Sequence, residues 1–197
     1  GQRCTAIRRI LLHKDIYDDF INTFVQLTNK IKYGDPLNPE NDMGTVISSE
    51  QASLIHKRVN KAINEGANLL FGNKIDNSLF SPTIVHNVNP SSELVKDETF
   101  GPVVSIIKIS SINDAINYIA NDSFALASGI ATNSEESAYK LYSSICVGQF
   151  SWNGKPGYRT ENAPFGGFKD SGNGEKEGVV LMTRAMRRLR TFYEHSI

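Results

Sequence analysis

The feature that most limits the fold of this chain is an alternation of short apolar runs with segments of helical spacing. The run 103–107 precedes a helical pattern over 112–120, and the run 127–131 precedes one over 135–144. Strands that alternate with helices of about ten residues are typical of a mainly parallel, twisted sheet with helices on both faces. We therefore predict an α/β fold for residues 1–197.

The N-terminal half follows the same alternation. Residues 8–13 form a short run with an apolar centre that suits a buried strand, and Asp15 is expected to cap the helical pattern that follows. A second helix is expected to begin at Ser48 or Ser49 and to end at Gly66. Short strands are then predicted near Phe71 and over 83–85, with a polar turn between them.

The C-terminal part contains a long interruption. Residues 153–174 are rich in glycine and proline but also carry aromatic side chains, which favours a functional loop over disorder. A helix is expected over 175–186. Residues 187–193 alternate enough for a terminal strand, and such an edge strand is suited to pairing with a second subunit. We therefore predict an oligomerisation strand within 187–197.

Composition excludes several classes of function. Lysines plus arginines number 21 and so do aspartates plus glutamates, so no net field favours nucleic acid. No apolar run approaches the roughly 18 to 20 residues that span a bilayer, so we expect no membrane partner. With 197 residues and 40% hydrophobic content, the chain has enough material for one substantial domain.

The cysteines and histidines also limit the classes of protein that this chain can belong to. Cys4 and Cys146 are too few for a disulfide scaffold or a zinc site, which favours a reducing, cytoplasmic setting. The four histidines lack ligand spacing, so no metal is expected. We expect Cys146 to lie in the core.

The chain opens with Gly1-Gln2-Arg3-Cys4-Thr5, which places a thiol beside a guanidinium with little apolar bulk around it. Thiol chemistry needs the thiolate, and a neighbouring positive charge lowers the pKa of a cysteine. The alternative is a cysteine packed as a small hydrophobe. These five residues alone do not decide between the two interpretations.

Two later stretches carry further candidates. In 97–102, Glu98 has a carboxylate that suits a ribose, and Phe100 has a ring that suits the wall of a flat ligand. A solvated Glu98 and a core Phe100 are the alternative. The glycine-rich stretch 164–172 suits a phosphate-holding turn, although it lacks the spacing of a P-loop or a dinucleotide fingerprint.

Taken in order, three segments resemble the NAD(P)-dependent aldehyde dehydrogenase superfamily. GQRC (1–4) resembles its nucleophile motif, ETFGP (98–102) its mid-domain signature and PFGGFK (164–169) its C-terminal signature. The resemblance implies that 1–197 is the thiol-bearing catalytic domain, a fragment of a longer enzyme. The dinucleotide-binding domain of the family would precede Gly1 and is absent from this chain, so we expect the isolated fragment to be inactive.

The resemblance also implies site roles. Cys4 would attack an aldehyde to give a thiohemiacetal, hydride would pass to NAD or NADP, and water would hydrolyse the resulting thioester. Glu98 would bind the nicotinamide ribose, Phe100 would contact the nicotinamide, and Phe165 would line the aldehyde tunnel. The general-base glutamate and the oxyanion asparagine of the family would lie upstream. A homodimer or homotetramer is implied for the complete protein.

Two arginines point to the substrate. Arg3 precedes the nucleophile, and Arg159 lies in KPGYRTE (155–161), which resembles the loop that shapes the aldehyde entrance of the family. Guanidinium groups bind phosphonates and carboxylates bidentately, which favours a small anionic aldehyde. The combination of GQRCT (1–5), PGYRTE (156–161) and KDSGNGEKEG (169–178) resembles phosphonoacetaldehyde dehydrogenases, which implies phosphonoacetaldehyde as the leading substrate. Lactaldehyde, succinate semialdehyde and glyceraldehyde 3-phosphate stay open. An ion pair between Arg3 and Glu161 is the structural alternative.

Two other classes of function stay open as alternatives. In a CoA-acylating semialdehyde dehydrogenase, coenzyme A would take the acyl group from Cys4, and an arginine beside the cysteine also occurs in that group. A scaffold relative that keeps the fold without turnover is the non-enzymatic alternative. The combination of Cys4, Glu98 and Phe100 argues against a scaffold.

Overall fold

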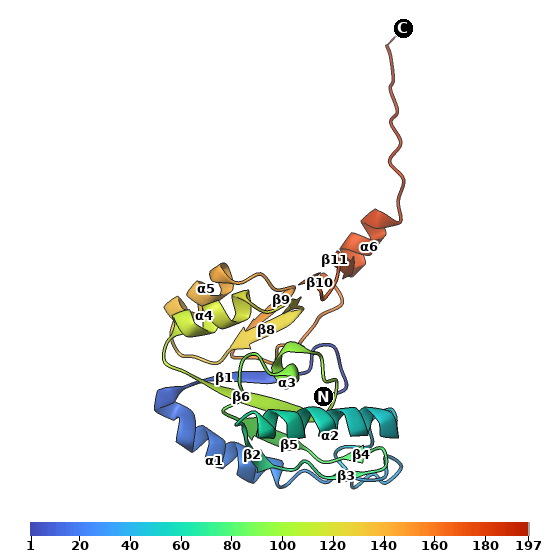
Figure 1. Ribbon diagram of the computed structural model, residues 1–197. Coiled ribbons are helices and arrows are strands. Elements are labelled where there is room, and N and C mark those ends of the chain that lie inside the picture. Colours follow the sequence, from blue (N-terminus) through green and yellow to red (C-terminus); the bar gives the residue numbers. More distant parts are fainter. Residues whose placement is uncertain (197) are drawn as a thin grey trace. The chain divides into compact units, whose positions relative to one another are not determined.

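The computed structural model describes residues 1–196, with Lys176 described by its backbone alone. The chain divides into two compact units, Gly1–Asp122 and Ser123–Ile197, and each is described by itself below. Both units combine strands with helices, which confirms the predicted α/β class (Figure 1). That all of 1–197 forms one catalytic domain stays a prediction.

A four-stranded sheet forms the centre of the first unit, in the order β1-β6-β5-β2. The first three strands of this order run parallel, and β2 joins the edge antiparallel to β5. A small hairpin, β3-β4, occupies the segment that the sequence suggested to be a polar turn. The strands are β1 (Arg9–His13), β2 (Asn68–Phe71), β3 (Ile75–Asp76), β4 (Leu79–Phe80), β5 (Thr83–His86) and β6 (Val103–Ile109).

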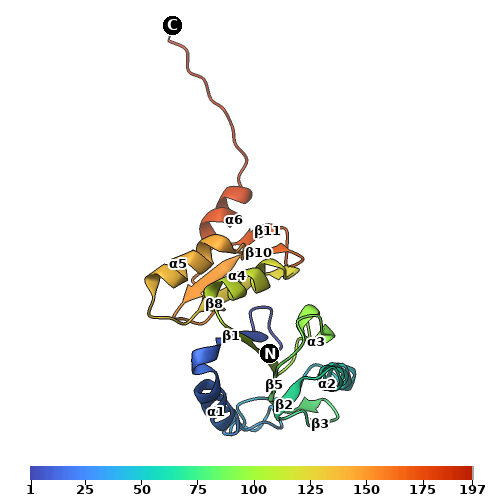
Figure 2. The same cartoon turned by 60° about the vertical axis from the view of Figure 1, so that its left-hand side comes forward.

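Helices cover both faces of this sheet, as predicted. Figure 2 shows α1 (Tyr17–Thr28) and α2 (Ser49–Asn64) on opposite sides of the strands. Successive strand residues point to opposite faces, so Ile106 packs with the α1 side and Ile107 with the α2 side. The remaining helical segments are the 3₁₀ turn η1 (Lys14–Ile16), α3 (Glu93–Lys96) and α4 (Ile112–Ala120).

The sequence of α2 explains its position. Ser48 caps the helix by accepting a hydrogen bond from the backbone N–H of Gln51, as its place before the apolar pattern predicted. One face of the helix is completely buried against the sheet and carries Ala52, Ile55, Val59 and Ala62. Burial of an isoleucine or valine contributes about 1.5–3 kcal/mol, so this face fixes α2 on the sheet.

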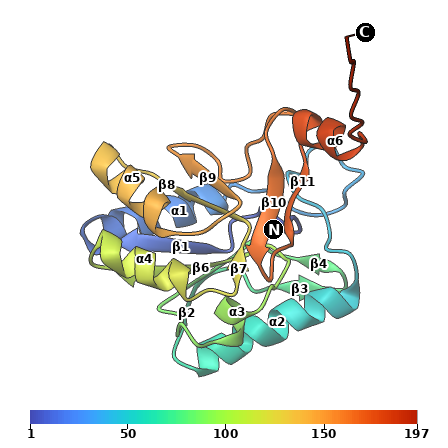
Figure 3. The same cartoon turned by 90° about the horizontal axis from the view of Figure 1, so that it is seen from above.

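The second unit contains a parallel pair, β8-β9, and an antiparallel sheet in the order β11-β10-β7. Figure 3 shows β10 and β11 side by side, with α6 following. The strands are β7 (Phe124–Ala125), β8 (Ala127–Ile130), β9 (Gln149–Trp152), β10 (Phe165–Lys169) and β11 (Gly174–Glu177). The helices are α5 (Glu135–Ser144) and α6 (Val179–Ala185).

The predicted helix over 175–186 is wrong in its first turn. Residues from Gly174 onward form β11, and α6 begins only after Gly178, whose φ is +104°. The reason is a close backbone approach, because a Cβ on Gly166 would lie 1.9 Å from the carbonyl oxygen of Gly174. Glycine allows β10 and β11 to pair where a helical pattern would otherwise prevail.

Residues 187–196 follow α6 as an extended tail and form no ladder within the described chain. Leu189, Phe192 and Tyr193 are exposed there. Pairing of this segment with a second subunit stays a prediction, and its last residue, 197, lies outside the described residues. Within residues 1–196, no helix is long and apolar enough to cross a membrane.

Gly101, just before β6, lies tightly against the side chain of Ile55 on α2. A Cβ at this position would lie 2.3 Å from Cδ1 of Ile55, a residue with no exposed surface. Such a contact is far shorter than any van der Waals separation, so a larger residue must displace Ile55 or move the chain away from α2.

We therefore expect Gly101→Ala to lower the free energy of unfolding by about 1–3 kcal/mol through overpacking. Ile55→Val removes Cδ1, the atom in conflict, and alone should cost about 0.5–1.5 kcal/mol. The double variant should be more stable than the sum of the two costs predicts, by at least about 0.5 kcal/mol. Urea unfolding followed by far-UV circular dichroism measures this coupling, and strictly additive costs would contradict the packing described.

Candidate active site

Cys4 lies at the tip of a turn near the start of the first unit. The backbone N–H of Ala6 donates to the carbonyl oxygen of Arg3 at 3.1 Å, which leaves Cys4 and Thr5 as the central residues of the turn. The thiol is exposed. The alternative of a cysteine packed in the core therefore does not apply to Cys4, nor to Cys146, which is exposed as well and whose predicted core position is wrong.

Two anchors hold the segment before Cys4. The side-chain oxygen of Gln2 accepts a hydrogen bond of 2.8 Å from the backbone N–H of Ile47, in the loop before α2. Gly1 lies directly against the mid-domain signature, because a Cβ on Gly1 would be 1.8 Å from the carbonyl oxygen of Gly101. The nucleophile motif and the signature 98–102 are thus brought together within one unit.

The signature alternates between solvent and core. Thr99 is buried, with 6% of its surface exposed, whereas Glu98 and Phe100 on either side are exposed. The carboxylate of Glu98 forms no hydrogen bond or ion pair with another residue in the described part of the chain. It is therefore available to an external donor such as a ribose hydroxyl.

Phe100 adopts an unusual backbone conformation. Its φ is +50°, in the left-handed region that bulky side chains rarely occupy, and its ring is 38% exposed. A strained aromatic residue held out of the core is typical of a ligand contact. The alternative of a core phenylalanine is wrong.

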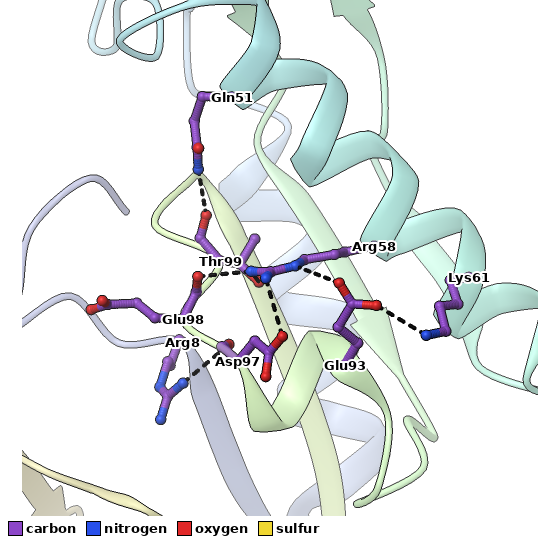
Figure 4. Close-up of polar contacts among 8 residues, drawn as sticks. All are labelled: Arg8, Gln51, Arg58, Lys61, Glu93, Asp97, Glu98 and Thr99. Carbon is purple, nitrogen blue, oxygen red and sulfur yellow. Dashed lines mark hydrogen bonds and ion pairs between the residues drawn. The ribbon is translucent and has the colours of Figure 1, made fainter. Parts of the chain in front are cut away.

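The backbone of the signature and of Asp97 before it is held by polar side chains that the sequence did not identify as functional. Gln51 donates a hydrogen bond of 2.7 Å to the carbonyl oxygen of Thr99, and Arg8 donates one of 3.3 Å to that of Asp97 (Figure 4). Burial lowers the pKa of Arg8, and the negative charge of Glu98 opposes this effect. The carboxylate of Glu98 therefore lies within the electrostatic range of Arg8.

Two further predicted site residues, Arg159 and Phe165, contact each other within the second unit. The guanidinium carbon of Arg159 lies 4.3 Å from the ring centre of Phe165, and Nη2 of Arg159 pairs with Glu177 at 2.7 Å. Phe165 itself is buried in β10. Arg159 is thus fixed in place, and Glu177 compensates part of its charge.

Arg3 differs from Arg159 in this respect. Its side chain is exposed, and within the described residues of the first unit it forms no ion pair. Its positive charge beside the thiol is therefore uncompensated there. Across residues 1–196, no group of three or more histidine, cysteine, aspartate or glutamate side chains is arranged to hold a metal ion.

Sequence comparison finds aldehyde dehydrogenases among the relatives of this chain. Sulfoacetaldehyde dehydrogenase from Neptuniibacter caesariensis is 36% identical over 191 residues, which cover 97% of this chain and 42% of that protein. Lactaldehyde dehydrogenase from Methanococcus maripaludis strain C5 is 34% identical over 197 residues, which cover 100% of this chain and 42% of that protein. The chain thus spans about two fifths of the length of these relatives.

Solved structures share the fold. Aldehyde dehydrogenase 21 from Physcomitrella patens, in complex with the reaction product succinate, matches 94% of this chain and 38% of its own, with a TM-score of 0.90 and 32% identity. Glyceraldehyde-3-phosphate dehydrogenase GapN from Methanocaldococcus jannaschii, complexed with NADP, matches 91% of this chain and 39% of its own. The TM-score is 0.85 and the identity is 37%.

The family profile covers almost the whole chain and includes the Cys4 turn and both signatures. It matches residues 1–191. The chain belongs to the aldehyde dehydrogenase family.

Proposed function

We propose that this chain is the thiol-bearing catalytic part of a longer NAD(P)-dependent aldehyde dehydrogenase, in which Cys4 is the nucleophile. The observation that carries the proposal is the contact of Gly1 with Gly101. It keeps the exposed thiol turn beside a signature that presents a free carboxylate and a strained aromatic ring. A thiol, a carboxylate and an aromatic wall are the groups that such an oxidation needs close together.

The chemistry assigned to Cys4 follows from its sulfur. The thiolate attacks the aldehyde carbon, forming a C–S bond and a thiohemiacetal whose oxygen carries the negative charge. We assign part of the stabilisation of that charge to the backbone N–H of Cys4. Loss of a hydride from the same carbon restores the carbonyl as a thioester, and water then releases the carboxylic acid and regenerates the thiol.

NAD(P), when bound, accepts the hydride. The exposed groups of the signature fit this cofactor, because a carboxylate accepts hydrogen bonds from both hydroxyls of a ribose and an aromatic edge limits the movement of a flat ring. We assign the ribose contact to Glu98 and the nicotinamide contact to Phe100. The GapN relative is complexed with NADP, but one relative does not decide the cofactor of this chain, so NAD and NADP both stay open.

We assign a small anionic aldehyde as the substrate. Sulfoacetaldehyde, succinate and glyceraldehyde 3-phosphate, the compounds in the names of three relatives, all carry an acidic group. Arg3 supplies an uncompensated charge next to the thiol, whereas Arg159 is partly neutralised by Glu177. Phosphonoacetaldehyde, with a tetrahedral anion like that of sulfoacetaldehyde, stays the specific prediction, and a neutral aldehyde such as lactaldehyde is the alternative.

The complete protein is proposed to be a homodimer or homotetramer. The support is the tail 187–196, in which the apolar side chains of Leu189, Phe192 and Tyr193 are exposed. Extended apolar segments of this kind are covered when they pair with another chain. A cytoplasmic location stays a prediction from the cysteine content.

In the complete enzyme, Cys4→Ser should lower kcat by on the order of 10³-fold or more, because a serine hydroxyl is hardly ionised at neutral pH and is a much weaker nucleophile than a thiolate. Cys146→Ser is the matched control, since its thiol is exposed too, and should leave kcat unchanged. The assay follows NAD(P)H formation and identifies the product. Activity that survives Cys4→Ser would contradict the assignment, and an acyl-CoA product in place of the free acid would indicate the CoA-acylating class.

Arg3→Gln should lower kcat/KM for sulfoacetaldehyde or phosphonoacetaldehyde about tenfold to hundredfold relative to propanal, as expected for the loss of one charge-assisted contact of about 1.5–3 kcal/mol. The variant Arg159→Gln/Glu177→Gln removes a balanced ion pair and should change this ratio less. The measurement is kcat/KM for the anionic and the neutral aldehyde in each variant. A ratio that is unchanged in both variants would refute the anion pocket.

A further inference from the structure

Arg58, on α2, holds the segment that carries Glu98. Its side chain is 11% exposed, and its guanidinium contacts four residues far along the chain (Figure 4). Nε pairs with Glu93 at 3.0 Å and Nη2 with Asp97 at 3.2 Å. Nη1 donates to the carbonyl oxygen of Glu98 at 2.7 Å and to Oγ1 of Thr99 at 3.5 Å. All three guanidinium nitrogens are therefore engaged.

The position of Arg58 on the helix explains how a charged group reaches this segment. Gln51, Ile55, Arg58 and Ala62 are spaced three or four residues apart, so they share one face of α2. Ile55 and Ala62 are buried on this face. A polar residue on a buried face needs partners, and Gln51 and Arg58 find theirs in the backbone and side chain of Thr99 and its neighbours.

The contacts of Arg58 fix the backbone around Glu98 but leave its carboxylate free. Figure 4 shows the carboxylate of Glu98 directed away from the guanidinium, while its carbonyl oxygen accepts the 2.7 Å hydrogen bond. Thr99 is held through its carbonyl by Gln51 and through its hydroxyl by Arg58. The segment is thus clamped immediately before and after the Cα of Glu98, which limits the directions its side chain can take.

We propose that Arg58 is a positioning residue for cofactor binding, which acts by orienting Glu98 toward the nicotinamide ribose. The inference rests on the proposed function, in which Glu98 contacts that ribose. Arginine suits the task because its planar fork spans several acceptors at once, whereas the ammonium of lysine is a point charge.

The charges around Arg58 support a positioning role. Glu93 is shared between Arg58 and Lys61, at 3.0 Å from each, and these two cations hold the pKa of Glu93 below its usual value. Glu93 therefore stays ionised at neutral pH and anchors the guanidinium to α3. Lys61 pairs with Glu93 but, among the described residues, forms no hydrogen bond or ion pair with residues 97–99, which makes it a matched control.

The test measures the dissociation constant of NAD(P) in the complete enzyme, by quenching of protein fluorescence, for Glu98→Ala, Arg58→Met and the double variant. Each single change should weaken binding by at least about tenfold, the equivalent of one hydrogen bond to a charged group. The double variant should bind no more weakly than Glu98→Ala, because Arg58 acts through Glu98. Lys61→Ala should leave the constant unchanged, and kcat at saturating cofactor should fall much less than affinity in Arg58→Met.

The outcomes separate the two claims. If Glu98→Ala leaves the dissociation constant unchanged, the cofactor role of Glu98 in the proposed function is wrong. If Glu98→Ala weakens binding but Arg58→Met has no effect, or the two effects add in full, the positioning role of Arg58 is overturned. If Arg58→Met does not fold, Arg58→Lys takes its place. Arg58→Lys keeps the positive charge but loses the planar guanidinium. Its effect on the dissociation constant is compared, alone and combined with Glu98→Ala, in the same way.

Discussion

The arrangement of the candidate site depends on the absence of a side chain at Gly101. On one side of this residue lies Cδ1 of Ile55, the buried centre of the α2 face, and on the other lies Gly1, the start of the nucleophile segment. A Cβ at Gly101 or at Gly1 would meet an atom at less than van der Waals distance. At this point only the Ile55 side chain separates the helix from the signature, and no side chain separates the signature from Gly1.

From this point the signature exposes its functional groups. Thr99 is buried and held through hydrogen bonds to α2, whereas its neighbours Glu98 and Phe100 are exposed. The left-handed backbone of Phe100 then turns the chain into Gly101 and β6. The burial of Thr99 therefore serves both the core and the site, because it fixes the chain between the two exposed side chains of Glu98 and Phe100.

The sequence predicted the regular elements well and the close backbone contacts poorly. Ser48 and the apolar spacing of α2 identified that helix because capping and helical periodicity are local signals. The sequence does not reveal the close approach of Gly166 to the carbonyl oxygen of Gly174, since a glycine required by a distant backbone looks the same as one in a loop. Arg58 was missed although it had a signal, a charge on the buried face of an amphipathic helix. Its partners lie 35 to 41 residues away, so their identity could not be read from the helix alone.

The most direct test of the account is to identify the atom that carries the acyl group during turnover. The complete enzyme is mixed with NAD(P) and an anionic aldehyde, quenched in acid within the first turnovers, digested, and mapped by mass spectrometry. The account predicts the added acyl mass on the peptide that contains Cys4, and an unmodified peptide for Cys146, the other exposed thiol. An acyl group on Cys146, or continued turnover with Cys4 unmodified throughout, would contradict it.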